Sequence, residues 1–532
     1  MNEFLKINWR VSHPSQLECY ALKEFLPDEA LQFSDNDSDS DEEKYPKIFR
    51  MRRVDYTPGL QEIKSIKIQS GIDQRGHQVC LEALKLFQSG KDRSCYTYKE
   101  NQSAATYDKL KMVILQENAK YLKYVAQQWQ EIDYFKQYFN ENVTDFGKCI
   151  WHKKKLRLKS YPQFYKELLM INTSLNEEEE IIEFNCVENN LQLEGFAQFC
   201  NPGLKSPCQL NTIKLESEKD KVQLPLNEDE GVLNYIQDVD VVISSSSIKH
   251  LVDTTESGKW LLPVVIKTIN NKQVAFFEKP FSLNDVSNKD LAQTTYKRLI
   301  QKAFCLPEPK PKPTYRKWLI TKTHCLNSLM KTHHKPVNLK VLIRNKTVAS
   351  ETINKTLQDV ILKPKIEMQL KYGANIQTKS ELIGEWASLF FRPFSNLYRV
   401  RISPVKGEVI CLEKCHIQKV IAEAQHHYHY KPQLGLATLQ KVFEDVSKLP
   451  VGNYLLRHLP KQGNFISVLK QSDKQEFDFY KELDQRSLSD CPNWVPLDCN
   501  FILPGFEALN RMPGMFQPRK TNLKRKMQTD VG

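Results

Sequence analysis

The sequence predicts an α+β protein with a mainly helical N-terminal region, a β-containing middle and a C-terminal α+β domain with antiparallel hairpins. Residues 103–139 contain no Gly or Pro and repeat apolar side chains at helical spacing, which predicts one long, aromatic-rich helix. Residues 178–281 contain the short alternating segments that are typical of strands. More strand patterns follow a proline-rich segment at 307–313, and residues 404–407 predict a tight turn between two of them.

The composition indicates a globular protein with more than one domain. A chain of 532 residues is too long for one hydrophobic core, and its length predicts about two to four domains. The 76 Lys and Arg against 64 Asp and Glu give a net charge of +12, which permits contact with nucleic acid without requiring it. Thirteen scattered cysteines predict a reducing compartment. Because no apolar run reaches the length of a signal peptide or a membrane span, the chain is expected to be soluble and not secreted.

Shifts in composition predict the domain organisation. Alternating prolines at 307–313 favour an extended linker, because proline continues neither a helix nor a central strand. In the middle region, Asn270-Asn271 lies between two strand-like runs and predicts a hairpin. The predicted segments are 1–60, largely disordered and acidic; 61–175, helical; 176–306, mixed and β-containing; 307–313, the linker; 314–516, the C-terminal α+β domain; and 517–532, a basic tail.

Two charged segments near the ends of the chain suggest regulation and transport. The acidic stretch SDNDSDSDEE places three serines among carboxylates, and the phosphorylation candidates are Ser34, Ser38 and Ser40. A solvated linker is the alternative interpretation. The basic cluster near the C-terminus is spaced like a nuclear import signal, with a solvated tail as the alternative, and consists of Arg519, Lys520, Lys524, Arg525 and Lys526.

The predicted long helix needs a packing partner. Ser103 is its expected N-cap. Tyr121 and Tyr124 widen its apolar surface beyond a narrow stripe, so the helix must pack against other helices or against another protein. Packing within the chain, against residues 79–87 and 164–170, is the interpretation that we favour, and docking to a partner is the alternative.

A cluster of cysteines and histidines raises the question of a metal site. The residues are Cys411, Cys415, His416, His426, His427 and His429. In the predicted helix, Cys415 and His426 are eleven residues apart and therefore about 16 Å apart along its axis. Two ligands of one zinc ion each lie about 2.0–2.3 Å from the metal. The sequence therefore predicts no metal site here, unless the helix is broken or residues 324–334 supply further ligands.

The sequence contains little that suggests catalysis. Asp238 and Asp240 resemble the paired carboxylates that hold a divalent ion in some transferases and phosphatases, but such a short pattern is common at the solvated start of a strand. We find no G-x-S-x-G, C-x-x-C or H-E-x-x-H motif. The sequence-based prediction is therefore a chain that is not an enzyme and has no cofactor.

Other residues suggest binding. In LYRVRIS, Arg399 and Arg401 alternate with apolar residues, so that one face of the strand could enter a core while the other presents guanidinium groups to phosphates, to an acidic partner or to water. Aromatic residues nearby are candidate anchors for a partner, with a place in the core as the alternative. The candidate partner-binding residues are Trp318, Trp386, Phe390, Phe391, Arg399 and Arg401.

The C-terminal part resembles a known family. From residue 315 to residue 516, the order of segments is similar to that of the C-terminal domain of little elongation complex subunit 2. The segments are Y-x-x-W-x-I, LKVLIRN, the hairpin LYRVRISPVKGEVICLE, then L-x-K-V-F-E-D-V-S-K-L-P-V-G-N-Y-L-L-R-H, and finally PLDCNFILPGFEALNRMPGMFQP.

This resemblance implies a nuclear, non-enzymatic subunit that acts through protein–protein docking. It implies a transcription-elongation complex that supports RNA polymerase II transcription of small nuclear RNA genes. The partners that it implies are the scaffold subunit 1 of the complex, an ELL-type elongation factor and RNA polymerase II. No membrane contact is expected.

Two alternative functions follow from the residues themselves. The basic C-terminal domain could bind nucleic acid directly, with Arg399 and Arg401 as contacts. Asp238 and Asp240 could instead be metal ligands in a divalent-metal-dependent transferase or nuclease.

Overall fold

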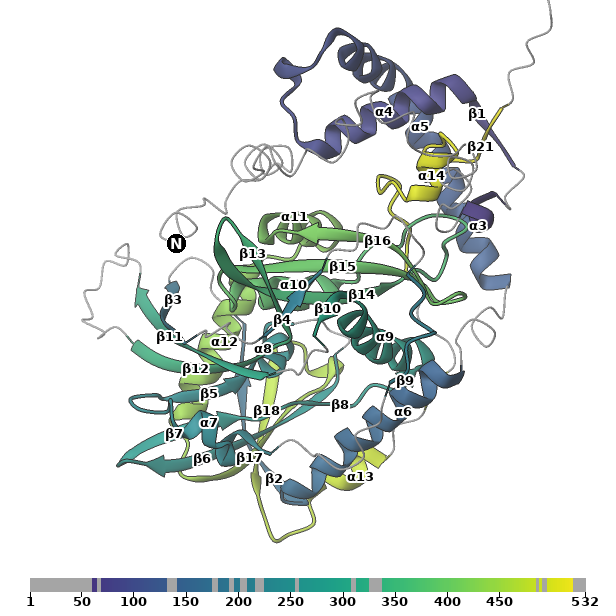
Figure 1. The fold of residues 1–532 in the computed structure, drawn as a ribbon. Helices are drawn as coiled ribbons and strands as arrows, with labels where there is room; N and C mark the ends of the chain where they lie inside the picture. The colour runs from purple at the N-terminus through teal and green to yellow at the C-terminus, as the bar shows by residue number, and fades with distance from the viewer. Residues whose placement is uncertain are drawn as a thin grey trace, which may run out of the picture.

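The protein contains two β-sheets with helices packed on and between them (Figure 1). This is the predicted α+β class, and the prediction is confirmed. The computed structural model describes residues 60–64, 68–131, 141–174, 180–190, 196–200, 208–215, 224–253, 258–307, 312–324, 337–484, 488–489 and 495–519. The three candidate phosphorylation sites and all but one residue of the candidate import signal lie outside these residues, as does nearly all of the segment predicted to be acidic and disordered.

The larger sheet draws strands from most of the chain. Its order is β19-β2-β18-β17-β6-β7-β5-β12-β11-β3, with β8 paired to β6. Strand β5 pairs in parallel with β7 and β12, and the other neighbours are antiparallel. The strands are β2 (Phe164–Asn172), β3 (Glu180–Asn190), β5 (Val241–Ser244), β6 (Trp260–Ile269), β7 (Lys272–Phe277), β8 (Phe281–Ser282), β11 (Lys312–His324), β12 (Val337–Thr347), β17 (Gly452–His458), β18 (Phe465–Gln471) and β19 (Phe477–Asp478).

The smaller sheet has the order β10-β4-β13-β14-β15-β16. Its two parallel pairs are β4 with β13 and β14 with β15. Two further strand pairs lie outside both sheets, β1 with β21 and β9 with β20. The bounds are β1 (Gln69–Asp73), β4 (Ala197–Phe199), β9 (Val286–Ser287), β10 (Cys305–Leu306), β13 (Ala349–Ile353), β14 (Thr356–Ile366), β15 (Ser395–Ser403), β16 (Glu408–Cys415), β20 (Leu488–Ser489) and β21 (Gln517–Arg519).

Helices connect the strands and cover the sheets. No helix within the described ranges is long and apolar enough to cross a bilayer. The α-helices are α3 (Leu60–Lys64), α4 (Gln74–Ser89), α5 (Tyr98–Glu131), α6 (Glu141–Leu156), α7 (Glu230–Leu233), α8 (Ser245–Val252), α9 (Asn288–Phe304), α10 (Lys379–Phe390), α11 (Ile417–Tyr428), α12 (Pro432–Ser447), α13 (Phe479–Asp484) and α14 (Pro504–Ala508).

Both predicted hairpins are present. Asn270 and Asn271 both have positive φ, 49° and 62°, and they join β6 to β7 with Ile269 opposite Lys272. Asparagine tolerates this backbone region better than most residues, which is why the pair makes a tight turn. Between β15 and β16, Gly407 takes a φ of 62° and closes the second hairpin.

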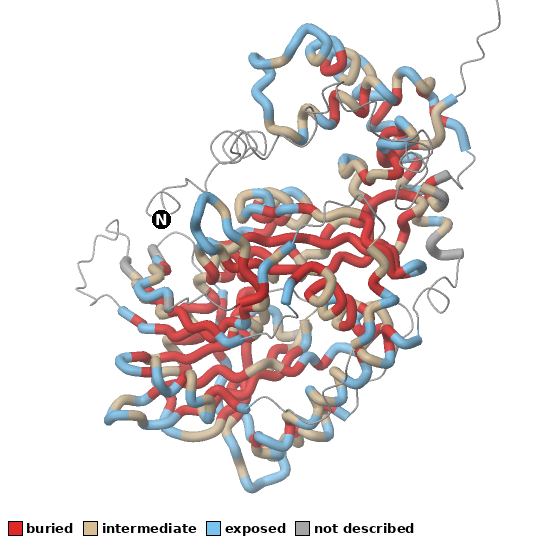
Figure 2. Tube along the Cα trace, in the orientation of Figure 1, coloured by how far each residue is buried: buried red, intermediate tan, exposed pale blue. Residues whose placement is uncertain are grey.

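The main core lies between the two sheets. Apolar residues of the larger sheet pack there against α8 and α12, and residues of the smaller sheet pack against α10 and α11. Alternation along β14 explains how one sheet serves two cores: Ile361 faces this core, whereas Val360 and Leu362 face the opposite side and pack with α9. Figure 2 shows that the buried residues concentrate in the sheets and in the helices between them.

The N-terminal helical region packs against the C-terminal segment. Strand β1 pairs with β21, and a buried cluster joins α4 and α5 to Met512 and Met515. Arg511 is buried and donates hydrogen bonds to the carbonyl oxygens of Ile63 and Met515. In Figure 1, α14 and β21 accordingly lie beside α3, β1 and α5.

The long helix α5 is confirmed, with a different start. It begins at Tyr98, five residues before the expected N-cap, so Ser103 lies buried inside the helix rather than at its end. Its packing against α4 agrees with the favoured interpretation for residues 79–87. Residues 164–170 instead form part of β2 in the larger sheet and belong to neither buried cluster that contains α5. Strands from both sides of residues 307–313 pair in the larger sheet, and the division of the chain into domains at that segment stays a prediction.

Candidate functional site: a lysine-lined pocket

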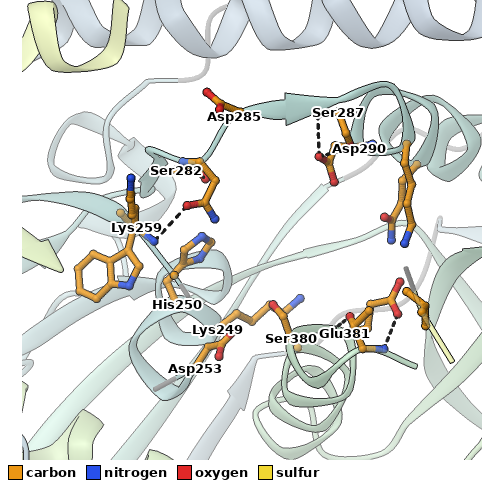
Figure 3. Close-up of a pocket in the computed structure, with 18 of the residues that line it drawn as sticks. Lys249, His250, Asp253, Lys259, Ser282, Asp285, Ser287, Asp290, Ser380 and Glu381 are labelled. Carbon is orange, nitrogen blue, oxygen red and sulfur yellow. Dashed lines mark hydrogen bonds between the residues drawn. The ribbon is translucent and has the colours of Figure 1, made fainter. Parts of the chain in front are cut away.

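A pocket of about 800 Å³ opens where α8, β14 and the first turns of α9 and α10 meet (Figure 3). Most of the side chains around it are polar, and four of them are lysines. The lining residues are Lys249, His250, Asp253, Gly258, Lys259, Trp260, Ser282, Asn284, Asp285, Ser287, Lys289, Asp290, Gln293, Lys363, Thr378, Ser380, Glu381, Gly384 and Val495.

Helix α8 carries two of these side chains into the pocket. It begins directly after the buried strand β5, where the side chain of Ser244 caps its N-terminus. Because Ile248 and Leu251 are buried in the core, Lys249 and His250 fall on the side of the helix that faces the pocket. Burial lowers the pKa of His250, whose Nδ1 lies 2.9 Å from the carbonyl oxygen of Ser246.

The carboxylates at the start of α9 and α10 are already engaged. Asp290 and Ser287 form a capping box at the start of α9, and Glu381 forms one with Thr378 at the start of α10. Glu381 also accepts a hydrogen bond of 2.7 Å from the Lys365 amine. Burial by itself would raise the pKa of Glu381, but Lys365 and Lys289 hold it at about 2.

Charges of both signs line the pocket: Lys249, Lys259, Lys289 and Lys363 lie there together with Asp253, Asp285, Asp290 and Glu381. Lys249 and Lys363 both line the pocket, although they come from α8 and β14. Burial, followed by repulsion from Lys363 and from Arg392, lowers the pKa of Lys249. Burial and the charge of Lys363 also lower the pKa of Lys297, which projects from α9. Lys297 is exposed to solvent and is not among the residues that line the pocket.

Burial lowers the pKa of Lys363, and nearby Glu385 opposes that shift. Among the residues that the structure describes, Lys249, Lys297 and Lys363 form no ion pair. By contrast, Lys365 lies two residues along the same strand and is paired with Glu381. The pocket is therefore polar and carries charges of both signs.

The two predicted arginines lie inside the fold instead. Arg399 and Arg401 are 1% and 2% exposed, so the expected solvent-facing side of β15 is wrong. Arg399 donates to Glu385 at 2.8 Å and to Glu423 at 2.7 Å, and Arg401 pairs with Glu367 and Glu413. Both arginines are buried because β15 lies between β14 and β16 and is covered on both faces, so that neither side of the strand is open to water.

The predicted aromatic anchors pack with one another in the main core. Trp318 of β11 stacks on Phe390 with ring centroids 5.7 Å apart, and Phe390 lies 5.6 Å from Trp386 and 4.9 Å from Phe391. Trp318, Trp386 and Phe391 are buried, and Phe390 is partly buried against them. Their binding to a partner stays a prediction, since all the contacts described here are within the chain.

A family model matches the C-terminal part of the chain. The model describes the C-terminus of NMDA receptor-regulated gene protein 2, and it covers residues 309–518. The same part of the chain gave the sequence resemblance, which ran from residue 315 to residue 516.

Curated relatives agree with that resemblance. The chain is similar, over part of its length, to little elongation complex subunit 2. The human protein of that name is 27% identical over 169 residues, and the mouse protein is 26% identical over 180 residues. These matches cover 30% and 32% of this chain but only 17% and 18% of the relatives. The chain therefore matches less than a fifth of the length of these relatives.

Among solved structures, similar chains include Rai1 and Dxo1 from yeasts. Rai1 from S. pombe has a TM-score of 0.36 and 10% identity over 58% of this chain and 93% of its own. Rai1 from Scheffersomyces stipitis, solved with (3'-NADP)+ and a calcium ion, has a TM-score of 0.39 and 10% identity over the same shares. Dxo1 from K. lactis, solved with manganese, has a TM-score of 0.32 and 9% identity over 59% of this chain and 96% of its own.

These matches correct the prediction that the chain is not an enzyme. Rai1 and Dxo1 are decapping-type nucleases, so the absence of familiar catalytic motifs was not sufficient ground for that prediction. At 9–10% identity and TM-scores below 0.4, the likeness assigns no activity to this chain.

The remaining predicted site residues lie outside the pocket. Asp238 pairs with Lys340 at 2.9 Å and Asp240 with Lys272 at 2.8 Å. Within the described ranges, no three His, Cys, Asp or Glu side chains converge as a metal site would require. Of the candidate import signal only Arg519 is described, and its Nε donates to the carbonyl oxygen of Ser70.

Sequence analysis missed the pocket lysines. Lys249 and Lys363 are far apart in the sequence, and neither belongs to a motif. The available signal was that Lys363 and Lys365 interrupt a strand that is otherwise largely buried, since charged residues at such positions need a partner or a ligand.

Proposed function

We propose that this chain is a subunit of a nuclear transcription-elongation assembly of the little elongation complex type. The observation that carries the proposal is the match of residues 309–518 to the family model, together with the relatives named little elongation complex subunit 2. In this proposal the chain acts by docking other proteins and supports RNA polymerase II transcription of small nuclear RNA genes. Its direct partners are a scaffold subunit and an ELL-type elongation factor.

The outer surface of α5 supports a docking role. Met112 and Leu115 are 65% and 51% exposed, and their spacing places them on the same side of the helix. Large apolar side chains next to each other on a surface are typical of protein contacts. The opposite side of α5, which includes Ile114, is buried within the chain, so the helix is held in place independently of a partner.

The proposal is tested by purifying the tagged full-length chain from nuclei and identifying bound proteins by mass spectrometry. We expect a scaffold subunit, an ELL-type factor and RNA polymerase II. Substituting Met112→Glu and Leu115→Glu together should reduce recovery of at least one of them, while Lys120→Glu on the exposed surface of the same helix serves as the control. Recovery of cytoplasmic partners alone would show that the proposal is wrong.

A further inference from the structure

The outer surface of α5 repeats apolar residues every seven positions. Ala105, Met112 and Ala119 form one series, and Leu115 and Leu122 form a second series that is offset from the first by three residues. Because seven residues make almost two helical turns, both series lie along one side of the helix. We call these five residues the α5 seam.

The α5 seam is largely uncovered within this chain. Met112 and Leu115 are 65% and 51% exposed, and Ala105 and Ala119 are exposed as well. Leu122, at the C-terminal end of the seam, is partly buried. The opposite side of α5 packs on α4. In Figure 1, α4 and α5 lie at the end of the molecule away from β6 and β7 of the larger sheet, so the seam faces outward from the cores that hold the helix.

The spacing of the seam is that of a coiled-coil helix, in which such residues insert between residues of a second helix. The small side chains of Ala105 and Ala119 leave room for larger side chains of that second helix, and the flexible Met112 adapts to what packs beside it. The one polar position of the repeat holds Asp108, which pairs with Arg93 at 2.6 Å. The seam is about 25 Å long at 1.5 Å per residue, which fits one short helix.

The residues that flank the seam determine which charge a partner must carry. In coiled coils, the positions on either side of the apolar seam form ion pairs that select the partner. On α5 these positions carry the exposed Lys109, Lys111 and Lys123, together with the uncharged Gln116 and Asn118. Within the described part of the chain, none of the three lysines forms an ion pair. A second copy of the seam would bring lysines against lysines in either orientation, which disfavours self-pairing.

We propose that the α5 seam docks an acidic amphipathic helix of a partner protein as a short coiled coil, with carboxylates of the partner paired to Lys109, Lys111 and Lys123. This inference rests on the proposed docking role of α5 and adds the kind of segment that docks there. Burial of the seam contributes most of the affinity, and the lysines select against basic helices. Because α5 already packs on α4, binding does not have to order this helix.

Binding is measured by fluorescence anisotropy, with a labelled peptide added to the full-length protein. The acidic probe is a designed peptide of about four heptads, with Ile and Leu at the seam positions and Glu on both flanks, and the basic probe has Lys in place of each Glu. We expect the acidic probe to bind, more weakly as the salt concentration rises, and the basic probe not to bind.

Three results would overturn the proposal. The first is no binding of the acidic probe, and the second is equal binding of both probes. The third is a dimer of the protein alone, seen by analytical ultracentrifugation, that Met112→Glu abolishes, since the seam would then pair with a second copy.

Charge reversal connects the binding to the flanking lysines. Lys109→Glu, Lys111→Glu and Lys123→Glu together should weaken binding of the acidic probe by about tenfold or more and should create binding of the basic probe. A misfolded variant would not gain a ligand, so this exchange of preference does not depend on a comparison of stabilities. An unchanged preference for the acidic probe would refute the assignment.

A matched control excludes a general attraction between a basic protein and an acidic peptide. Lys99→Glu, Lys120→Glu and Lys474→Glu change the net charge by the same amount at exposed positions that do not flank the seam. This control should bind the acidic probe like the parent protein. If it instead loses binding as strongly as the seam variant, net charge rather than the seam attracts the probe, and the proposal is wrong.

A further pair of variants tests the apolar part of the seam. Met112→Ala and Leu115→Ala together should weaken binding of the acidic probe by about tenfold or more, whereas Met112→Leu should retain it. Unchanged binding by the double variant would refute the seam as the docking surface. Probe binding without co-purified elongation factors would support this inference and contradict only the proposed assembly. Co-purification of those factors without probe binding would contradict the seam alone.

Discussion

At the scale of single residues, burial decides what a charged or polar side chain does. His77 is fully buried, and its Nδ1 accepts a hydrogen bond of 3.1 Å from the backbone N–H of Met512. Burial, with a contribution from nearby Arg511, lowers the pKa of His77 to about 4. The neutral imidazole therefore belongs to the contact between the N-terminal region and the C-terminal segment.

This gives a prediction for pH dependence. The unfolded chain binds a proton at His77 below about pH 6.5, whereas the folded chain does so only near pH 4, so stability falls as the pH is lowered through that window. Acidification from pH 7 to 5 should cost about 2 kcal/mol through this residue. Urea unfolding of His77→Gln should show a smaller pH dependence than the parent, and His152→Gln, at an exposed position, should not differ from it.

A second prediction concerns the buried arginine network. Arg399→Leu removes the shared partner of Glu385 and Glu423 and should destabilise the protein by about 3–5 kcal/mol, because carboxylates stay behind without their counter-ion. Adding Glu385→Leu to this variant should recover part of the loss. Chemical denaturation measures both variants, and strictly additive losses would contradict a coupled network.

At the scale of elements, the close approach of two helices determines which residue a helix position requires, as much as helix propensity does. A Cβ atom on Gly147 of α6 would lie 2.5 Å from the carbonyl oxygen of Leu291 on α9. That oxygen belongs to the backbone and cannot rotate away. The glycine is thus required for the approach of α6 to α9, although glycine is a weak helix former.

We predict that Gly147→Ala lowers the melting temperature, despite the gain of about 1 kcal/mol that Ala provides in a helix. Gly384→Ala in α10 is the matched control, since its added Cβ would meet only Lys249 at an ordinary contact distance of 3.9 Å. The control should melt at the parent temperature or slightly above it. Equal stability gains in both variants would show that α6 and α9 do not pack as described.

The elements also show which structural features a sequence pattern predicts correctly and which it does not. Asn270-Asn271 and residues 404–407 formed the predicted hairpins, because turn geometry depends on a few neighbouring residues. The alternation in β15 was equally clear but misleading. Its arginines suggested a solvent-facing side, whereas α10 and α11 cover that side and supply two glutamates that pair with Arg399. Arg401 pairs with Glu367 and with Glu413 of β16.

At the scale of the whole molecule, the two ends of the described chain stabilise each other. Strand β21 pairs with β1, and Arg511 ties the loop before β21 to the end of α3. The long helix α5 joins the same contact, because Tyr121 packs edge to face with Phe516 at 5.1 Å. The N-terminal region is therefore anchored by residues that come more than 370 positions later.

A truncation tests this arrangement. Ending the chain after Leu503 removes α14 and β21 and should accelerate backbone hydrogen exchange in β1 and α4, because their buried contacts are lost. Exchange in β6, β7 and β17, in the middle of the larger sheet, should stay close to that of the full chain. Unchanged protection of α4 in the truncated protein would contradict the proposed anchoring.

The sequence by itself determined the features that depend on near neighbours: the α+β class, the long helix and the two hairpins. It also carried the partial resemblance to little elongation complex subunit 2, since that resides in the order of segments. The tertiary structure decided the rest. It buried Arg399 and Arg401 and placed Lys249 and Lys363 at the same pocket. Strand pairing and helix packing bring together residues that are distant along the chain, and no local sequence pattern encodes which charged side chains will meet.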